Sequence, residues 1–155
     1  MKKNINTLSL LGTEVCLLYQ KILVPIDGSE HSKRALKEAI KVSKMTGGAI
    51  TLLNVTPSGS SMASSHKQPN SEILQNKNKS VLVEGQKIAE TEGILVETLL
   101  LEGQIVHEIV KTAKDGHYDL IVVGARGLSK LEEIMLGSVS HGVTETATCP
   151  VIVTR

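Results

Sequence analysis

The sequence predicts an α/β fold: a single doubly wound, open parallel five-stranded sheet (order 3-2-1-4-5) with helices on both faces. Short segments rich in β-branched residues recur along the chain and are apolar almost throughout, which is typical of strands covered on both faces. Segments with apolar residues at helical spacing separate them. The length of 155 residues suits one domain with one core.

The predicted strands alternate with the predicted helices along the chain. In order, the strands cover residues 21–26, 49–55, 95–101, 120–123 and 150–154. The third strand is partly polar, so we expect it at an edge of the sheet. Right-handed crossovers between parallel strands then place helices on both faces.

Apolar residues at helical spacing predict four helices. Glycines at positions 47–48, 93 and 116 should end the first three, and the fourth should begin after Gly137-Ser138 and run to about residue 146. The predicted buried faces contain Ala35, Leu36, Ala39, Ile40 and Met45 in the first helix, Ile73, Leu74, Val81, Leu82, Gly85, Ile88 and Ala89 in the second, and Ile105, Val106, Ile109, Val110 and Ala113 in the third.

Two segments lie outside this pattern. Residues 1–20 precede the first predicted strand, and we interpret them as an N-terminal extension, disordered or loosely packed, before a domain at 21–155. Residues 56–70 are rich in serine without periodicity, which predicts a long loop. Loops of this length are usually functional lids or disordered segments.

Composition argues against several functional classes. A formal net charge of +1 offers no electrostatic footprint for nucleic acid or an anionic membrane. No apolar run approaches the roughly 18 residues of a membrane span. Cys16 and Cys149 lack metal-site spacing and suit a reducing compartment, so we expect a cytoplasmic protein. With no Trp or Phe, a bound base would have to lie between aliphatic side chains.

The predicted sheet places two loops opposite each other. Ligands of such sheets bind outside the carboxyl ends of the strands, where the strand order reverses. The loops after Ile26 and Val123 meet at that point. In the first, Asp27 could accept hydrogen bonds from a ribose or adenine, or the segment could simply be a turn in which Ser29 caps the next helix.

The second loop has the features of a phosphate site. Gly124 and Gly127 allow close approach of a backbone to a phosphate, and a helix then opens at Ser138, where free N–H groups and the helix dipole attract an anion. The hydroxyls of Ser138 and Ser140 would add donors. The alternative is that the glycines only serve tight turns. The sequence lacks the P-loop motif and lacks G-x-G-x-x-G after the first strand.

These residues resemble a known family. Pro25-x-Asp27-Gly28-Ser29 after the first strand, Gly-x-x-Gly followed by nine residues and Gly-Ser, and the closing segment from Thr148 to Arg155 are similar to the universal stress protein family. The resemblance extends from about residue 21 to the last residue. The spaced glycine motif is that of the ATP-binding branch.

The resemblance implies ATP, with Mg²⁺, as the ligand. It also implies a homodimer formed through the last strand, from Val151 to Thr154, where an unpaired apolar edge would be an aggregation hazard. The residues that it assigns to the nucleotide are Pro25, Asp27, Val55, Gly124, Ala125, Arg126, Gly127, Leu128, Ser129, Lys130, Gly137, Ser138, Val139 and Ser140. Val55 would meet adenine through its backbone.

Three functions remain open at this point. The first is an adenine-nucleotide-binding regulatory protein of the stress response, acting on an unidentified protein partner. The second is a slow ATPase or autophosphorylating enzyme, against which stands the lack of a convincing general base: the acids nearest the phosphates are Glu132 and Glu133. The third is a structural dimer module without nucleotide.

Overall fold

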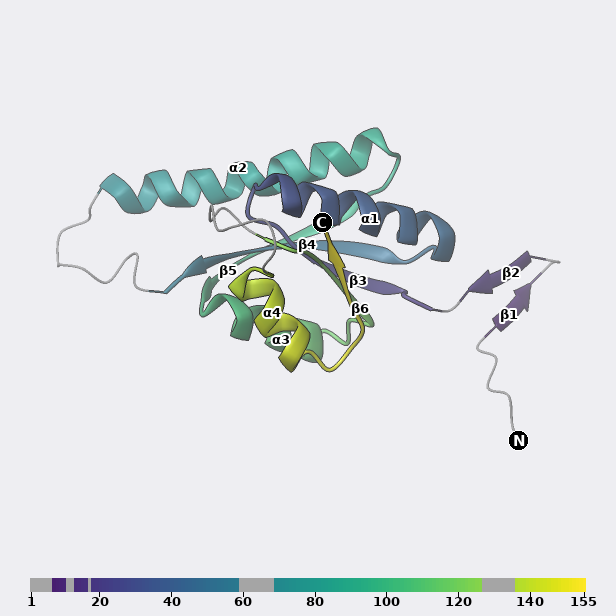
Figure 1. Ribbon diagram of the computed structural model, residues 1–155. Helices are drawn as coiled ribbons and strands as arrows, with labels where there is room; N and C mark the ends of the chain where they lie inside the picture. The colour runs from purple at the N-terminus through teal and green to yellow at the C-terminus, as the bar shows by residue number, and fades with distance from the viewer. Residues whose placement is uncertain (1–6, 11–12, 17, 59–68, 127–135) are drawn as a thin grey trace.

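Five parallel strands form the central sheet of the computed structural model, in the order β5-β4-β3-β6-β7 (Figure 1). The structure describes residues 7–10, 13–16, 18–58, 69–126 and 136–155. The strands are β3 (Lys21–Pro25), β4 (Ala49–Pro57), β5 (Val96–Gly103), β6 (Leu120–Gly124) and β7 (Val151–Thr154). The predicted fold class and strand order are confirmed, including the partly polar β5 at one edge.

Within the described residues, four helices cover the two faces of this sheet. They are α1 (Glu30–Thr46), α2 (Pro69–Thr91), α3 (Ile105–Asp115) and α4 (Ser138–Thr146). In Figure 1, α1 and α2 lie above the sheet, and α3 and α4 lie below it. None of the helices in the described ranges is long and apolar enough to cross a membrane.

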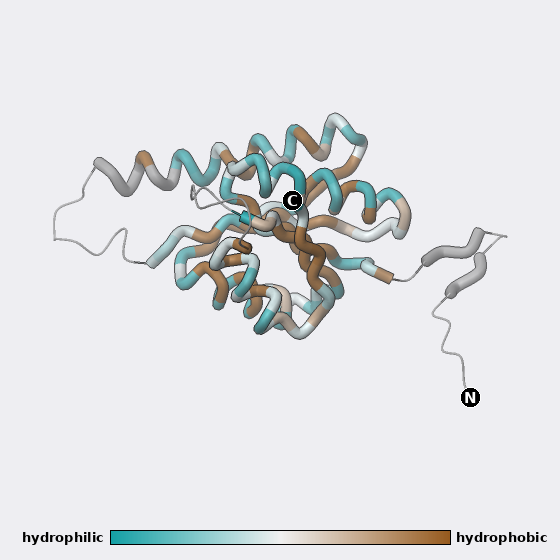
Figure 2. The backbone as a smooth tube through the Cα atoms, in the orientation of Figure 1, coloured by the Kyte–Doolittle hydropathy of each residue, from teal (hydrophilic) through white to brown (hydrophobic). Residues whose placement is uncertain are grey.

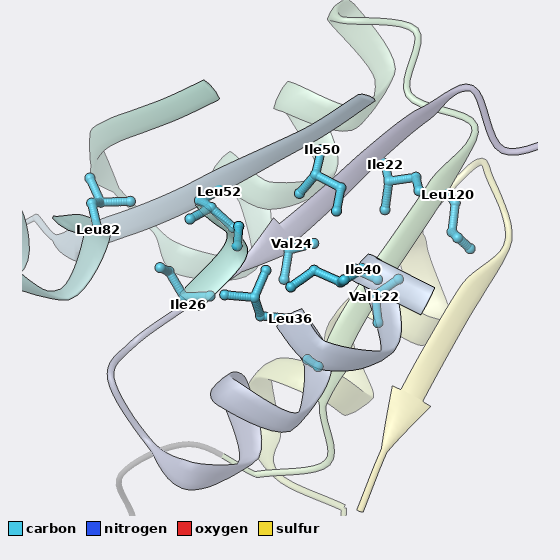
Figure 3. Close-up of a cluster of buried hydrophobic side chains, with 13 residues drawn as sticks. Ile22, Val24, Ile26, Leu36, Ile40, Ile50, Leu52, Leu82, Leu120 and Val122 are labelled. Carbon is cyan, nitrogen blue, oxygen red and sulfur yellow. The ribbon is translucent and has the colours of Figure 1, made fainter. Parts of the chain in front are cut away.

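Successive side chains of the buried strands point to opposite faces of the sheet and contribute to two separate clusters of core residues. Ile22 and Val24 of β3 point to the face covered by α1 and α2, whereas Leu23 between them points to the face covered by α3 and α4. Figure 3 shows Leu36 and Ile40 of α1 directed at the first cluster. Because both faces are covered, the central strands are apolar throughout, as the brown strands between teal-rich helices in Figure 2 illustrate.

Two side chains predicted to be buried are exposed. Met45 is 75% exposed, because the buried stripe of α1 continues from Ile40 through Ser43 and Thr46 instead. Ile73 in the first turns of α2 is 65% exposed. In both cases the side chain is apolar, which suggested burial, but its position around the helix axis is on the exposed side.

The predicted loop at residues 56–70 was too long at both ends. β4 continues to Pro57, where it still pairs with Gly103 of β5, and α2 begins at Pro69. Proline is well tolerated at the start of a helix, because the N–H group that it lacks would have no partner within the helix there. The remainder of that predicted loop, at 59–68, lies outside the described residues.

The N-terminal segment contains a small sheet of its own. β1 (Thr7–Leu10) and β2 (Thr13–Cys16) form an antiparallel pair that is separate from the main sheet and lies apart from it in Figure 1. The structure therefore adds a hairpin to a segment for which we expected no regular structure. The division into an extension at 1–20 and a domain at 21–155 stays a prediction.

The turn from α1 into β4 uses two glycines for two different reasons. Gly47 ends α1 in the left-handed conformation, with φ 75°, and its N–H donates to the Ser43 carbonyl at 2.8 Å. Gly48 instead lies against the backbone carbonyl of Tyr19, where a Cβ atom would overlap the carbonyl oxygen. This contact joins the start of β4 to the segment that enters β3.

Candidate functional site

A cavity of about 390 Å³ opens at the carboxyl ends of β3, β4 and β6. The strand order reverses between β3 and β6, and the crossovers from these two strands leave to opposite faces of the sheet. The volume lies within the range of roughly 300–1,000 Å³ that is usual for small-molecule sites. The sequence prediction therefore placed a crevice where the structure has one.

The loop from β3 to α1 forms one wall and is held mainly by its own residues. The Asp27 Oδ1 atom accepts a hydrogen bond from the Ser29 N–H at 2.9 Å. Ser29 caps α1 by accepting from the Ser32 N–H at 3.1 Å, so the structural interpretation of this serine is confirmed. Asp27 also lines the cavity, and its role as an acceptor for a ribose or adenine stays a prediction.

The main chain of Val55 forms a second wall. Successive residues of a parallel strand direct their N–H and C=O groups to the strands on opposite sides. Residues two apart therefore face the same neighbouring strand. The Leu53 carbonyl accepts from the Ile26 N–H at 2.8 Å, so Leu53 and Val55 both face the β3 side of β4. β3 ends at Pro25, and among the described residues no backbone group bonds to the N–H or C=O of Val55 on that side. A donor and an acceptor are thus left at the cavity.

The N-terminus of α4 forms the third wall. Gly137 caps the helix, and the first intrahelical bond runs from the His141 N–H to the Gly137 carbonyl at 2.9 Å. The N–H groups of Ser138, Val139 and Ser140 therefore have no helical partner, and all three residues line the cavity. Such a helix start attracts anions.

The prediction that two serine hydroxyls face the ligand is wrong for Ser140. Its side chain is buried, and its hydroxyl donates toward the Ala125 carbonyl at 2.8 Å, with the Gly137 carbonyl 2.9 Å away. A hydroxyl has a single hydrogen, so this donor is already used within the fold. Ser138, which is exposed, is the serine whose hydroxyl remains available.

Gly124 is required by the packing of the fold, and its role in the close approach of a phosphate stays a prediction. A Cβ atom at this position would lie 2.7 Å from the backbone carbon and oxygen of His31, in the first turn of α1. At Gly137 the corresponding contacts, with the Ala125 carbonyl oxygen and the Arg126 Cα, are 3.1 and 3.2 Å. Gly124 and Gly137 thus set how closely α1 and α4 approach the end of β6.

We therefore expect Gly124→Ala to lower the free energy of unfolding without any ligand present, by about 1–3 kcal/mol as for other overpacked positions. Urea denaturation of the ligand-free protein measures this. Gly137→Ala should lower the free energy of unfolding less, because the neighbours of the added Cβ atom need to move by only a few tenths of an ångström. Equal stability of Gly124→Ala and the parent would mean that α1 shifts without cost.

The structure brings most of the predicted site residues together. Those that line the cavity are Pro25, Asp27, Val55, Gly124, Arg126, Gly137, Ser138, Val139 and Ser140. Ala125 is buried and is not among the lining residues. Gly127, Leu128, Ser129 and Lys130 lie outside the described residues, as do Glu132 and Glu133.

Sequence reasoning named Val55 and the start of α4 but missed the lining contributed by α2, by α3 and by Asn54 of β4. Lys77 and Asn78 of α2 line the cavity, and Asn78 Nδ2 donates to the Thr56 hydroxyl at 2.7 Å. Ile105 and Ile109 of α3 add apolar surface from the other face. Asn54 carried a usable signal, because it is a lone amide in an otherwise apolar strand segment.

The described part of the cavity holds more cationic than acidic side chains. Arg126 and Lys77 line it, and Asp27 is the carboxylate among the described lining residues. Within the described ranges, no group of three or more His, Cys, Asp or Glu side chains is arranged to hold a metal ion. The site is therefore suited to an anionic organic ligand with an apolar portion.

The fold and cavity define a class of protein, a doubly wound α/β domain with a small-molecule crevice beside a helix N-terminus. Comparison with known proteins identifies the family. The model of the universal stress protein family matches residues 18–155, and the chain belongs to this family. The resemblance seen in the sequence is thus confirmed.

Similar proteins come from bacteria and archaea. Universal stress protein YxiE of Bacillus subtilis is 38% identical over 149 residues, which cover 89% of this chain and 100% of that one. The solved structure of MJ0577, a universal stress protein of Methanocaldococcus jannaschii, superposes with a TM-score of 0.77 at 31% identity, covering 89% and 96% of the two chains. A universal stress protein from Archaeoglobus fulgidus, solved in complex with dAMP, superposes with a TM-score of 0.69 at 25% identity, covering 90% and 100%.

Proposed function

We propose that this protein binds ATP in the cavity between β3, β4 and α4 and acts as a cytoplasmic regulatory protein of the stress response. The observation that carries the proposal is the presence of an anion-attracting helix start and an unpaired backbone donor–acceptor pair in one cavity of about 390 Å³. The dAMP complex of the A. fulgidus relative supports an adenine nucleotide as the ligand class.

The α4 end of the cavity suits the phosphates. The N–H groups of Ser138, Val139 and Ser140 point out of the first turn, where the helix dipole also favours negative charge. Arg126 lines the same cavity and carries a guanidinium group, which binds phosphate oxygens well. This end contributes attraction without selecting the base.

The Val55 end suits adenine. Adenine carries an amino donor next to a ring-nitrogen acceptor, which matches a backbone C=O and N–H on one residue. Guanine has an acceptor oxygen where adenine has the amino group, so it would face the Val55 carbonyl with another acceptor. Apolar side chains of Ile105, Ile109 and Val139 line the same space and can cover the base without aromatic stacking.

Mg²⁺ would enter together with the phosphates. Mg²⁺ usually binds one or two carboxylates plus phosphate oxygens and water. Asp27 is the carboxylate among the described lining residues, and its Oδ1 atom already accepts from the Ser29 N–H. The described residues thus fit an ion held largely by the nucleotide, with Asp27 Oδ2 as the available carboxylate oxygen.

The same features favour binding over hydrolysis. Activation of water needs a general base within hydrogen-bond reach of the γ-phosphate. Asp27 is the carboxylate among the described lining residues; its Oδ1 atom already accepts from the Ser29 N–H, and its Oδ2 atom is the oxygen proposed for Mg²⁺, so neither oxygen is left to take a proton from water. The test for the enzymatic alternative is phosphate release with and without Mg²⁺, and we expect no release above that of a mock purification.

Homodimerisation through β7 is part of the proposal. β7 is an edge strand of the sheet and its residues Val151, Ile152 and Val153 are half-buried in the single chain. A second copy that pairs with this edge would satisfy its free backbone groups. Size-exclusion chromatography with light scattering measures the oligomeric state.

We expect calorimetry to show saturable ATP binding with one site per chain. GTP should bind about 5- to 150-fold more weakly, because the acceptor–acceptor contact at Val55 costs about 1–3 kcal/mol. Mass spectrometry of small molecules released on denaturation provides the second readout. A protein that releases no nucleotide and gives no heat with ATP, ADP or AMP would favour the structural dimer module.

A further inference from the structure

Asn54 is a buried amide next to the backbone groups of Val55. Its side chain is 4% exposed and lines the cavity. The Nδ2 atom donates to the Ile26 carbonyl at 2.8 Å, whereas the buried Oδ1 atom has no partner among the described residues. A buried acceptor without a partner is a cost to the fold. The presence of the amide therefore calls for a reason other than stability.

The Ile26 carbonyl is the group that would otherwise continue the ladder between β3 and β4. The Ile26 N–H donates to the Leu53 carbonyl, so in a regular parallel ladder the Ile26 carbonyl would accept from the Val55 N–H. No such bond forms in the structure, and the Asn54 amide donates to that carbonyl instead. Ile26 itself is fixed, because its side chain packs in the core beside Leu36 and Leu52 (Figure 3).

We propose that Asn54 is a positioning residue that ends the β3–β4 ladder one hydrogen bond early and so keeps the Val55 N–H available to the ligand. The inference rests on the proposed nucleotide site and deepens it. Base recognition by Val55 then depends on a neighbouring side chain that itself need not touch the base. The proposal thus gives a reason for keeping a buried amide whose Oδ1 atom has no hydrogen-bond partner among the described residues.

The test is Asn54→Leu, which has a similar size and carries neither donor nor acceptor. The freed Ile26 carbonyl should take up the Val55 N–H, so the ladder extends by one bond. We expect amide exchange at Val55, followed by NMR without ligand, to slow at least tenfold. The urea midpoint should stay unchanged or rise, while calorimetry should show ATP affinity about tenfold lower.

Thr51→Val is the matched control on the same strand. Thr51 is also buried and polar, and its hydroxyl accepts from the Tyr118 hydroxyl at 3.0 Å, away from the cavity. This variant removes a hydrogen bond of similar kind and should leave both Val55 exchange and ATP affinity unchanged. A loss of affinity in both variants would indicate a general effect of destabilising β4 and would overturn the proposal.

The two readouts separate this proposal from the proposed function. Unchanged Val55 exchange in Asn54→Leu overturns the role of Asn54, whatever happens to ATP binding. Slower exchange with undiminished ATP affinity also overturns it, because the Val55 N–H would then have no part in binding. If the parent protein binds no adenine nucleotide, the proposed function fails, and slower exchange would still establish Asn54 as the residue that ends the ladder.

Discussion

Gly48→Ala is expected to lower the free energy of unfolding by about 3 kcal/mol, near the upper end for overpacked positions. The added Cβ atom would overlap the backbone carbonyl oxygen of Tyr19. The Thr46 hydroxyl lies between that carbonyl, at 3.2 Å, and the Val42 carbonyl, at 3.0 Å, and the adjacent Ala49 N–H donates to the Gln20 carbonyl at 2.9 Å. The backbone on both sides of the contact is therefore tied, and urea denaturation should show the loss.

Gly47→Ala is the matched control for that substitution. Gly47 has a φ of 75°, but the space around its missing Cβ atom is open. Its replacement should cost only the left-handed conformation of a non-glycine residue, about 1 kcal/mol. If the two variants lose stability equally, the contact with Tyr19 relaxes without cost and conformation alone explains both glycines.

Ser138→Glu is expected to change nucleotide affinity and stability in opposite directions. A carboxylate in the first turn of α4 interacts favourably with the positive end of the helix dipole. It should therefore raise the free energy of unfolding by about 0.5 kcal/mol. The same charge would face the phosphates, and repulsion of about 2–3 kcal/mol corresponds to roughly a 30- to 150-fold loss of ATP affinity. Ser138 is exposed, so the longer side chain needs no repacking. Calorimetry and urea denaturation provide the two measurements.

Ser138→Gln separates charge from size at this position. The glutamine has the length of glutamate without its charge, so most of the ATP affinity should remain. Equal losses in the two variants would mean that the serine hydroxyl or the space around it matters, and not the charge. Unchanged affinity in Ser138→Glu would place the phosphates away from α4.

The strands, the helices and the helix ends could be predicted because they follow from local patterns, whereas the strand order, and with it the position of the crevice, came with the doubly wound fold class. Strands that are apolar throughout demand cover on both faces, and glycines at Gly47 and Gly93 mark helix ends with positive φ. The capping role of Ser29 is equally local, since donor and acceptor are three residues apart. Such features need no knowledge of distant segments.

The features that were missed depend on packing between distant segments. Met45 is apolar and yet exposed, because its angular position on α1 and not its chemistry decides burial. His31 of α1 lies close to Gly124 at the end of β6, and Lys77 of α2 lines the cavity. The sequence pattern does not place these elements relative to each other. The hydroxyl of Ser140 illustrates the same limit, because its acceptor lies 15 residues away at Ala125.

The walls of the cavity come from both ends of the domain, which constrains when the site can exist during synthesis. Ile22 of β3 pairs with Leu120 of β6, and α4 follows only at Ser138. A growing chain therefore has no complete site until its last helix has left the ribosome and β6 has docked beside β3. A nucleotide cannot guide early folding of this protein. At the proposed site it would stabilise the finished domain, by mass action on the native state.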